Sequence, residues 1–203
     1  MHVTLLGAGS VGSAMGRRLA AVGVPVRYGL RDISSPADLP GPASDPRSAA
    51  AGADLVLVAV PADAAVEALS AAAPAAGTVV VDLTNPLRWD QGPVWAPPAG
   101  GSVAARLAEA FPHLRVLKGF NHFGAEIQAD PAFEPARPLA LFAGDDAEAK
   151  QVALGLADRM GFEALDAGPL RNAALLEALA VTWIHLATVG GAGREIAFQL
   201  LRR

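Results

Sequence analysis

The sequence predicts an α/β fold with a doubly wound, mostly parallel sheet and a helical extension at its C-terminal end. Short runs of aliphatic residues alternate with longer segments in which apolar residues recur at helical spacing. Two of the runs, 54–60 and 78–83, are almost wholly apolar, as expected of strands that helices cover on both faces. Strands that alternate with helices in this way pair in parallel within one sheet.

The chain begins with a strand, a helix and a second strand. Residues 2–6 form a short β-branched and aliphatic run that Gly7 stops. Residues 10–22 carry apolar side chains at helical spacing, and Gly23 ends this helix. A second strand follows at 24–28.

The remaining elements repeat the alternation. The strand at 54–60 leads into an alanine-rich helix at 62–73, which precedes the strand at 78–83. Further strands are expected at 114–120, 139–143 and 162–165, and further helices at 103–111, 147–160 and, with a glycine-rich break, 170–201. The stretch 90–101 is long enough for a lid over a site, but we favour a plain surface loop.

Composition excludes several classes of function. The chain has 203 residues, of which 52% are hydrophobic, and its formal net charge of -4 without a basic run argues against a nucleic-acid partner. Because Cys is absent, disulfides and thiolate metal sites are excluded, and we expect no metal. The apolar runs are too short to cross a bilayer and the first residues lack a signal peptide, so we expect a cytoplasmic protein without a membrane partner.

The first strand leads directly into a glycine motif at the start of the first helix. Residues 7–12 read Gly-Ala-Gly-Ser-Val-Gly, the GxGxxG pattern. Gly7 permits the tight turn, Gly9 lets the backbone approach a pyrophosphate, and Gly12 lets helix and strand pack closely. The helix N-terminus offers free N–H groups to phosphates. This arrangement predicts a Rossmann-type site for a nicotinamide dinucleotide; a flavin or an S-adenosyl ligand is the alternative.

The end of the second strand bears on the choice between NAD and NADP. An NAD site places a carboxylate there to hold the ribose 2′-OH, whereas here the strand ends Tyr28-Gly29-Leu30-Arg31-Asp32. The Arg31 guanidinium suits a 2′-phosphate, which favours NADP(H). Asp32 keeps NAD open, because a shift of register would present its carboxylate to the ribose.

Two parts of the chain are expected. Residues 1–168 form the dinucleotide-binding domain, and 169–203 form C-terminal helices that pack on the sheet or on a second subunit. The second part is amphipathic, which suits either core packing or a dimer face, and we expect a homodimer.

Ligands of an open parallel sheet bind outside the carboxyl ends of the strands. The candidate residues there are Val60 and Pro61, Asn85, and the pair Asn121 and His122. Asn85 and Asn121 are placed to hydrogen-bond the nicotinamide or its ribose, and among the four His residues we expect His122 to touch substrate. A turn-forming role is the alternative for the Asn residues, and a structural role is the alternative for Pro61.

Several of these motifs, taken together, resemble the deazaflavin-dependent NADP oxidoreductase family, which includes the dinucleotide domain of the STEAP metalloreductases. The resemblance rests on the glycine turn, on 28–31, on Val60-Pro61, on Phe120-Asn121 and on the later segments 144–147 (GDDA), 165–170 (LDAGPL) and Glu177. It covers most of the chain in order.

The resemblance implies roles for individual residues. Gly9, Ser10 and Val11 would hold the pyrophosphate, and Arg31 the 2′-phosphate. Val60 and Pro61 would lie along the ribose and nicotinamide, and 121–123, ending at Phe123, would lie beside the nicotinamide where the second substrate stacks. Many members have Ser where this chain has Leu30, so a hydroxyl donor to the 2′-phosphate is missing.

The inventory of proton donors bears on the reaction. Apart from the scattered His residues, the chain has one Tyr and two Lys, Lys118 and Lys150. Reduction of a carbonyl or imine usually needs a placed acid, whereas a deazaflavin or flavin ring delocalises the charge that hydride brings. We therefore expect hydride transfer between NADP(H) and a small-molecule ring acceptor such as 8-hydroxy-5-deazaflavin, with Asn121 and His122 at the reacting centre.

Two alternatives remain open. One is an NADPH-dependent reductase of a small carbonyl or imine, with His122 or Lys118 as the acid. The other is a redox sensor that binds dinucleotide without turnover.

Overall fold

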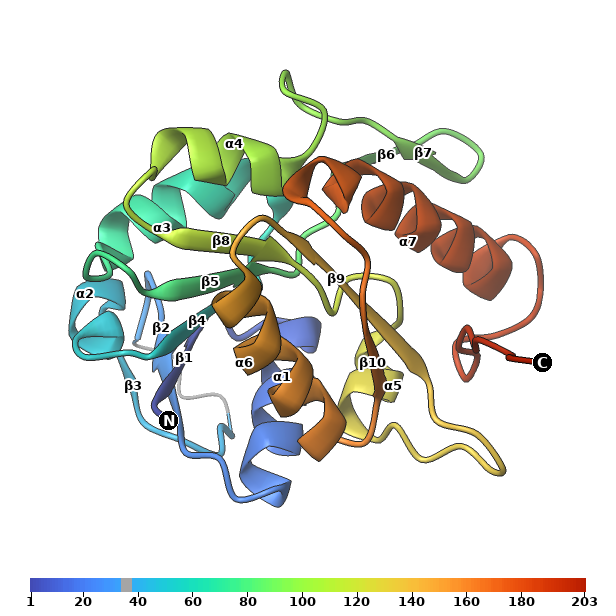
Figure 1. Ribbon diagram of the computed structural model, residues 1–203, viewed down its shortest axis with the longest axis horizontal. Helices are drawn as coiled ribbons and strands as arrows, with labels where there is room; N and C mark the ends of the chain where they lie inside the picture. Colours follow the sequence, from blue (N-terminus) through green and yellow to red (C-terminus); the bar gives the residue numbers. More distant parts are fainter. Residues whose placement is uncertain (34–37) are drawn as a thin grey trace.

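The computed structural model describes residues 1–33 and 38–203, and it has the doubly wound α/β architecture that the sequence predicts (Figure 1). Within these residues one eight-stranded sheet has the order β10 (Glu163–Asp166), β9 (Leu139–Gly144), β8 (Arg115–Lys118), β5 (Val79–Asp82), β4 (Leu55–Val58), β1 (Val3–Leu6), β2 (Val26–Gly29) and β3 (Ala43–Ser44). β8 and β9 run antiparallel, and the other described neighbours in the sheet run parallel. The strand order reverses at β1, which opens a ligand crevice at the carboxyl ends of β1 and β4.

Helices cover both faces of the sheet (Figure 1). One face carries α1 (Ser10–Ala21), α5 (Ala125–Ala129) and α6 (Ala147–Arg159), and the other carries α2 (Pro46–Ala50), α3 (Ala65–Ala72) and α4 (Val103–Ala110). Consecutive strand residues point to opposite faces, so Leu5 joins the apolar cluster under α1 and Leu6 the cluster under α3. The sheet is therefore buried on both sides, as the apolar strand runs predicted.

The shortest helices and strands were not predicted from the sequence. Neither β3, with two residues, nor α2 and α5, with five residues each, spans enough positions to show a period. The stretch after β5 holds a second small sheet, the antiparallel hairpin of β6 (Leu87–Trp89) and β7 (Pro93–Trp95). The loop expected from residue 90 thus begins inside a hairpin.

The C-terminal helical extension is confirmed over part of its predicted length. A 3-10 turn, η2 (Leu170–Asn172), leads into α7 (Ala173–Thr188), which contacts β7, β9 and α4. The prediction of helix as far as residue 201 was wrong, because Gly191 and Gly193 adopt φ of +73° and +75° just after α7. The division of the chain near residue 168 remains a prediction.

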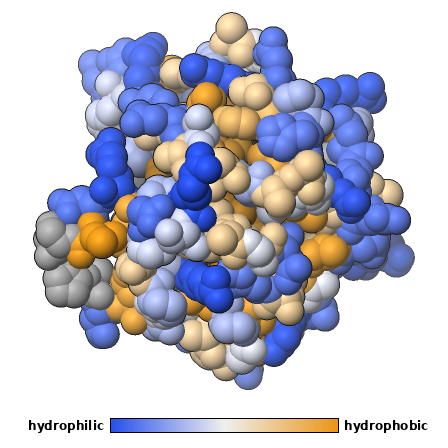
Figure 2. Space-filling view, turned by 90° about the vertical axis from the view of Figure 1, so that its left-hand side faces the viewer, coloured by the Kyte–Doolittle hydropathy of each residue, from blue (hydrophilic) through white to orange (hydrophobic). Residues whose placement is uncertain are grey.

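The side of the molecule formed around α2 and α3 shows hydrophilic and hydrophobic residues mixed over its surface (Figure 2). Over 1–33 and 38–203, no helix has the length and apolar character needed to cross a membrane.

Candidate functional site

The glycine turn joins β1 to α1, and two of its glycines are required by the protein's own backbone. Gly7 has a φ of +99°, and a Cβ atom there would lie 2.6 Å from the carbonyl oxygen of Ala59. A Cβ atom on Gly12 would lie 2.2 Å from the carbonyl oxygen of Gly7. Both positions therefore exclude a side chain, whether or not a ligand is bound.

Gly9 differs from these two glycines. It is the N-cap residue of α1 with a φ of -68°, and a Cβ atom built there meets nothing within 4 Å. Beside it, Ser10 and Val11 begin α1, and the first turn of a helix carries N–H groups without intrahelical acceptors. An open space over a helix N-terminus suits a pyrophosphate, so these residues are compatible with a bound dinucleotide.

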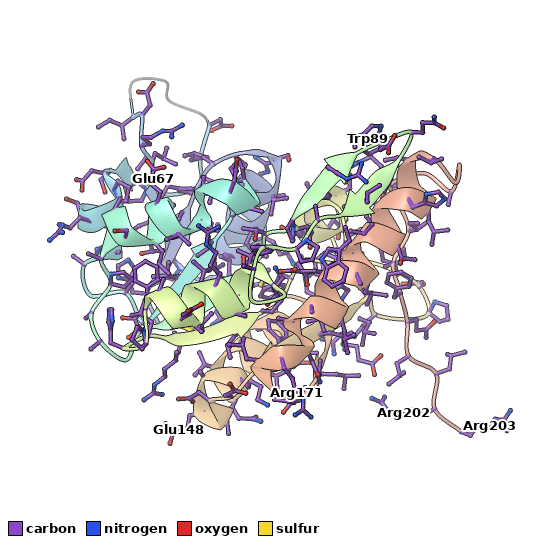
Figure 3. All side chains as sticks on the ribbon, turned by 90° about the horizontal axis from the view of Figure 1, so that it is seen from above. Glu67, Trp89, Glu148, Arg171, Arg202 and Arg203 are labelled. Atoms are coloured by element: carbon purple, nitrogen blue, oxygen red, sulfur yellow. The ribbon has the colours of Figure 1, made fainter. Side chains whose placement is uncertain are left out.

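A cleft of about 380 Å³ opens beside this turn, and we call it the first cleft. Its lining includes Gly7, Gly29, Leu30, Arg31, Val60 and Pro61. Arg31 is exposed, so its guanidinium is accessible to a ligand. The opposite wall comes from α3 and the turn before it, where small alanine side chains accompany the carboxylate of Glu67 (Figure 3). The structure thus brings together, around one cleft, five of the cofactor-binding residues predicted from the first half of the chain: Gly7, Leu30, Arg31, Val60 and Pro61.

A second cleft, of about 460 Å³, lies at the ends of β4 and β5. Its lining includes Pro61, Asp63, Asn85, Pro86, Val103 and Arg106. The hairpin and the segment after it close one side through Leu87, Ala96 and Pro98. Pro61 lines both clefts, so the two clefts adjoin at the carboxyl end of β4.

Asn85 and Asn121, which the sequence placed at two strand ends, are bonded to each other. The Asn85 Nδ2 group donates to the carbonyl oxygen of Asn121 over 2.7 Å, and Asn121 Nδ2 donates to Asn85 Oδ1 over 2.8 Å. Asn121 Nδ2 also donates to the carbonyl oxygen of Leu176 in α7 over 3.0 Å. Asn85 lines the second cleft, while Asn121 is buried behind it and ties β5, β8 and α7 together.

His122 and Phe123 lie in the protein interior. His122 Nε2 lies 3.0 Å from the carbonyl oxygen of Leu139 and 3.4 Å from the backbone N of Leu141. Burial lowers the pKa of His122 to about 4, so the ring is neutral near pH 7. The Phe123 ring stacks on Phe162 with centroids 4.8 Å apart. Among the described residues these two side chains are not part of the lining of either cleft, and their predicted roles at the cofactor remain predictions.

A group of buried charges lies at the same edge of the sheet, and sequence reasoning missed it. The ammonium of Lys118 lies 2.8 Å from Asp82 Oδ2 and 3.0 Å from Glu177 Oε1, and it also donates to the carbonyl oxygen of Thr84. All three charged side chains are fully buried. We call Asp82, Lys118 and Glu177 the buried charge cluster.

The two carboxylates of this cluster accept further hydrogen bonds from N–H groups. Asp82 Oδ1 accepts from the Thr84 N–H, and Glu177 accepts from the Val103 N–H over 2.9 Å and from Trp95 Nε1 over 3.3 Å. Burial raises the pKa of Glu177, and the neighbouring Lys118 ammonium counteracts that rise. Within 1–33 and 38–203, no group of three or more His, Asp or Glu side chains is placed to hold a metal ion.

The signal for the cluster was present in the sequence. Two buried strands each end in a charged residue, VVVD at 79–82 and RVLK at 115–118. Asp82 and Lys118 pair directly across β5 and β8. Glu177, in contrast, comes from a helix far along the chain, and no local pattern joins it to these strands.

Comparisons with known proteins agree with this geometry. The family described as NADP oxidoreductase, coenzyme F420-dependent, matches residues 2–86. The metalloreductase STEAP3 of Rattus norvegicus is 32% identical over 181 residues, which cover 87% of this chain. The chain spans 36% of the length of that relative.

Solved structures extend the likeness to the whole chain. A candidate F420-dependent NADP reductase from Arthrobacter sp. FB24 is 30% identical with a TM-score of 0.87, and the match covers 98% of this chain and 99% of that protein. A reductive aminase from Aspergillus terreus, crystallised with NADPH4, has a TM-score of 0.68 at 16% identity over 93% of this chain and 62% of its own, so it shares the fold. With the glycine turn and both clefts in place, these matches confirm the predicted resemblance, and the chain belongs to the family of coenzyme F420-dependent NADP oxidoreductases.

Proposed function

We propose that this protein transfers hydride between NADP(H) and a flat ring acceptor of the deazaflavin or flavin class. The observation that carries the proposal is the meeting of two clefts at Pro61. A dinucleotide held by the glycine turn would have its adenosine end in the first cleft, beside β2. Its nicotinamide would then lie toward the ends of β4 and β5, where the second cleft offers room for a second ligand.

The chain's residues divide the binding work between the two clefts. The N-terminus of α1 and the open space at Gly9 accept the pyrophosphate, and Arg31 pairs with the 2′-phosphate. Leu30 supplies no hydroxyl donor at this end, so Arg31 supplies the discrimination between NADPH and NADH. Pro61 and Asn85 border the nicotinamide, and Asn121 holds Asn85 in place.

The burial of the candidate acids supports a ring acceptor. His122 is 1% exposed and Lys118 is fully buried, so neither is positioned to hand a proton to a carbonyl or imine substrate. When bound, NADPH would supply a hydride, and a deazaflavin or flavin ring would accept it together with one proton from water. The protein then needs to hold two rings in contact and to exclude competing reactions.

The test is a spectrophotometric assay of NADPH oxidation with oxidised 8-hydroxy-5-deazaflavin and, separately, flavin mononucleotide. We expect oxidation that depends on one of these acceptors and is slower with NADH. A small cyclic imine and a small ketone serve as control substrates, because turnover of these alone would support the carbonyl or imine reductase instead. Tight NADPH binding without oxidation by any acceptor would contradict enzymatic hydride transfer and favour a redox sensor.

The homodimer and the cytoplasmic location remain predictions. Analytical ultracentrifugation at micromolar concentration tests the former directly.

A further inference from the structure

Glu177 connects three parts of the chain through its two carboxylate oxygens. Oε1 accepts from the Lys118 ammonium in β8 and from the Val103 N–H at the start of α4. Oε2 accepts from the indole N–H of Trp95, at the end of β7. A single side chain of α7 therefore fixes a sheet edge, a helix N-terminus and a hairpin relative to one another.

Two of these three parts form the wall of the second cleft. Val103 lines it directly, and Ala96, the neighbour of Trp95, lines it from the hairpin side together with Leu87 and Pro98. Movement of the hairpin away from α7 would widen the cleft, and loss of the Val103 contact would release its far side. Arg88 and Asp90 form an exposed ion pair within the hairpin, so that pair does not tie the hairpin to α7.

Burial of the three charges in this cluster costs more free energy than a purely structural contact requires. Burying two carboxylates and one ammonium costs several kcal/mol per ion before pairing, and well-packed apolar side chains stabilise a core at least as well. What a charged, directional group adds is one defined geometry, because Glu177 accepts from three donors at once. Because Glu177 lies beside the second cleft, this fixed geometry would hold the cleft walls in place.

We propose that Glu177 is a positioning residue for the acceptor, and that it acts by latching the β6–β7 hairpin through the Trp95 indole. Lys118 and Asp82 hold the Glu177 carboxylate in the orientation that the latch needs. The proposal rests on the proposed function in one respect, namely that the second cleft receives the acceptor. The latch itself does not depend on what binds there.

The test compares Trp95→Phe with Trp89→Phe in the full-length protein. Trp95→Phe removes the indole N–H and keeps an aromatic ring, whereas Trp89 is 59% exposed on the same hairpin and is the matched control (Figure 3). Hydrogen–deuterium exchange is measured over residues 87–96 and over α7. We expect exchange in the hairpin to rise about tenfold in Trp95→Phe, as for the loss of one hydrogen bond to a charged acceptor, and to stay within twofold of wild type in Trp89→Phe. Exchange in α7 should not change.

Kinetics with oxidised 8-hydroxy-5-deazaflavin supply the second readout. Trp95→Phe should raise KM for the deazaflavin about tenfold while kcat and the Kd for NADPH stay within twofold. In a Glu177→Gln background the same substitution should have a smaller effect, because the two groups act as a pair. If Glu177→Gln does not fold, the two tryptophan variants still decide the question.

The outcomes separate the latch from the proposed function. Equal exchange in Trp95→Phe and wild type, or an equal rise in both tryptophan variants, overturns the latch. Faster hairpin exchange with an unchanged KM overturns the positioning role and leaves only a structural contact. Absence of deazaflavin turnover in wild type contradicts the proposed function, while the exchange data still test the latch.

Discussion

At the scale of single residues, the glycines of the first turn fall into two kinds. Gly12 faces backbone 2.2 Å from a Cβ position, so its lack of a side chain serves the fold. Gly9 has an ordinary φ and open space around its Cβ position, so nothing in the described protein requires glycine there. A pyrophosphate in this space would account for the glycine.

This difference leads to a prediction for the two alanine variants. Gly9→Ala should keep the thermal midpoint of wild type within about 2 °C and lose NADPH affinity by at least about tenfold, because its Cβ occupies the pyrophosphate space. Gly12→Ala should lower the midpoint by several degrees. Differential scanning fluorimetry and titration of NADPH fluorescence measure both quantities. Unchanged NADPH affinity in Gly9→Ala would contradict a pyrophosphate at this turn.

The burial of His122 makes the stability of the protein depend on pH. Its pKa is about 4 in the folded protein against 6.5 in an ordinary setting, because burial disfavours the charged ring. Between these two values the unfolded chain binds a proton that the folded chain does not. The free energy of unfolding therefore falls as the pH falls through this window.

The corresponding prediction concerns stability against pH. Between pH 7.5 and pH 4.5, His122 should account for a loss of about 2–3 kcal/mol in the free energy of unfolding. In His122→Gln, which offers an N–H donor to the carbonyl oxygen of Leu139, this part of the pH dependence should be absent. Urea denaturation at pH 7.5, 6.0 and 4.5 gives the comparison. Identical pH profiles for the two proteins would show that another group is responsible.

At the scale of elements, the buried charge cluster links β5, β8 and α7 through charged side chains. Each of the three charged groups has its partners, so removal of the central ammonium leaves two carboxylates buried against each other. The cost of such an unpaired buried charge exceeds the net value of the intact pair.

Lys118→Met should therefore destabilise the protein by about 3–5 kcal/mol. The chain's other lysine supplies the control, because Lys150 pairs with the partly exposed Asp166 at 2.8 Å, and Lys150→Met should cost less than about 1 kcal/mol. Chemical denaturation at neutral pH measures both. Equal effects would mean that the cluster contributes no more than a surface pair.

At the scale of the whole molecule, the two clefts lie side by side along the carboxyl edge of one sheet. The first cleft draws on β1, β2 and α3, and the second on β4, β5 and α4 together with the hairpin. Because β1, β2, β4 and β5 belong to one sheet, occupation of the first cleft should stabilise the whole fold.

NADPH at about 100 times its Kd should raise the free energy of unfolding by about 2.7 kcal/mol, a shift of about 5–10 °C in thermal midpoint. NADH at the same concentration should give a smaller shift if Arg31 binds the 2′-phosphate. Arg31→Ala should bring the two shifts together. Scanning fluorimetry with both nucleotides provides the measurement, and equal shifts in the wild-type protein would argue against a role of Arg31 in nucleotide choice.

Local patterns determined much of this protein on their own. The longer strands, α1, α3, α4 and α6 follow from apolar runs and helical spacing, because each spans enough residues to show a period. The glycine turn was readable because strand, turn and helix are consecutive in the chain. Arg31, Val60 and Pro61 could be placed because the carboxyl ends of parallel strands meet at one edge.

Tertiary structure alone decided the rest. No local pattern distinguishes a strand-end His that faces a ligand from one that turns into the core, and His122 turned into the core with Phe123. The buried charge cluster joins side chains 36 and 59 residues apart, and the Trp95 contact spans 82 residues. Such pairs form only when packing brings distant elements together, so the second cleft and its hairpin wall became visible only in the folded chain.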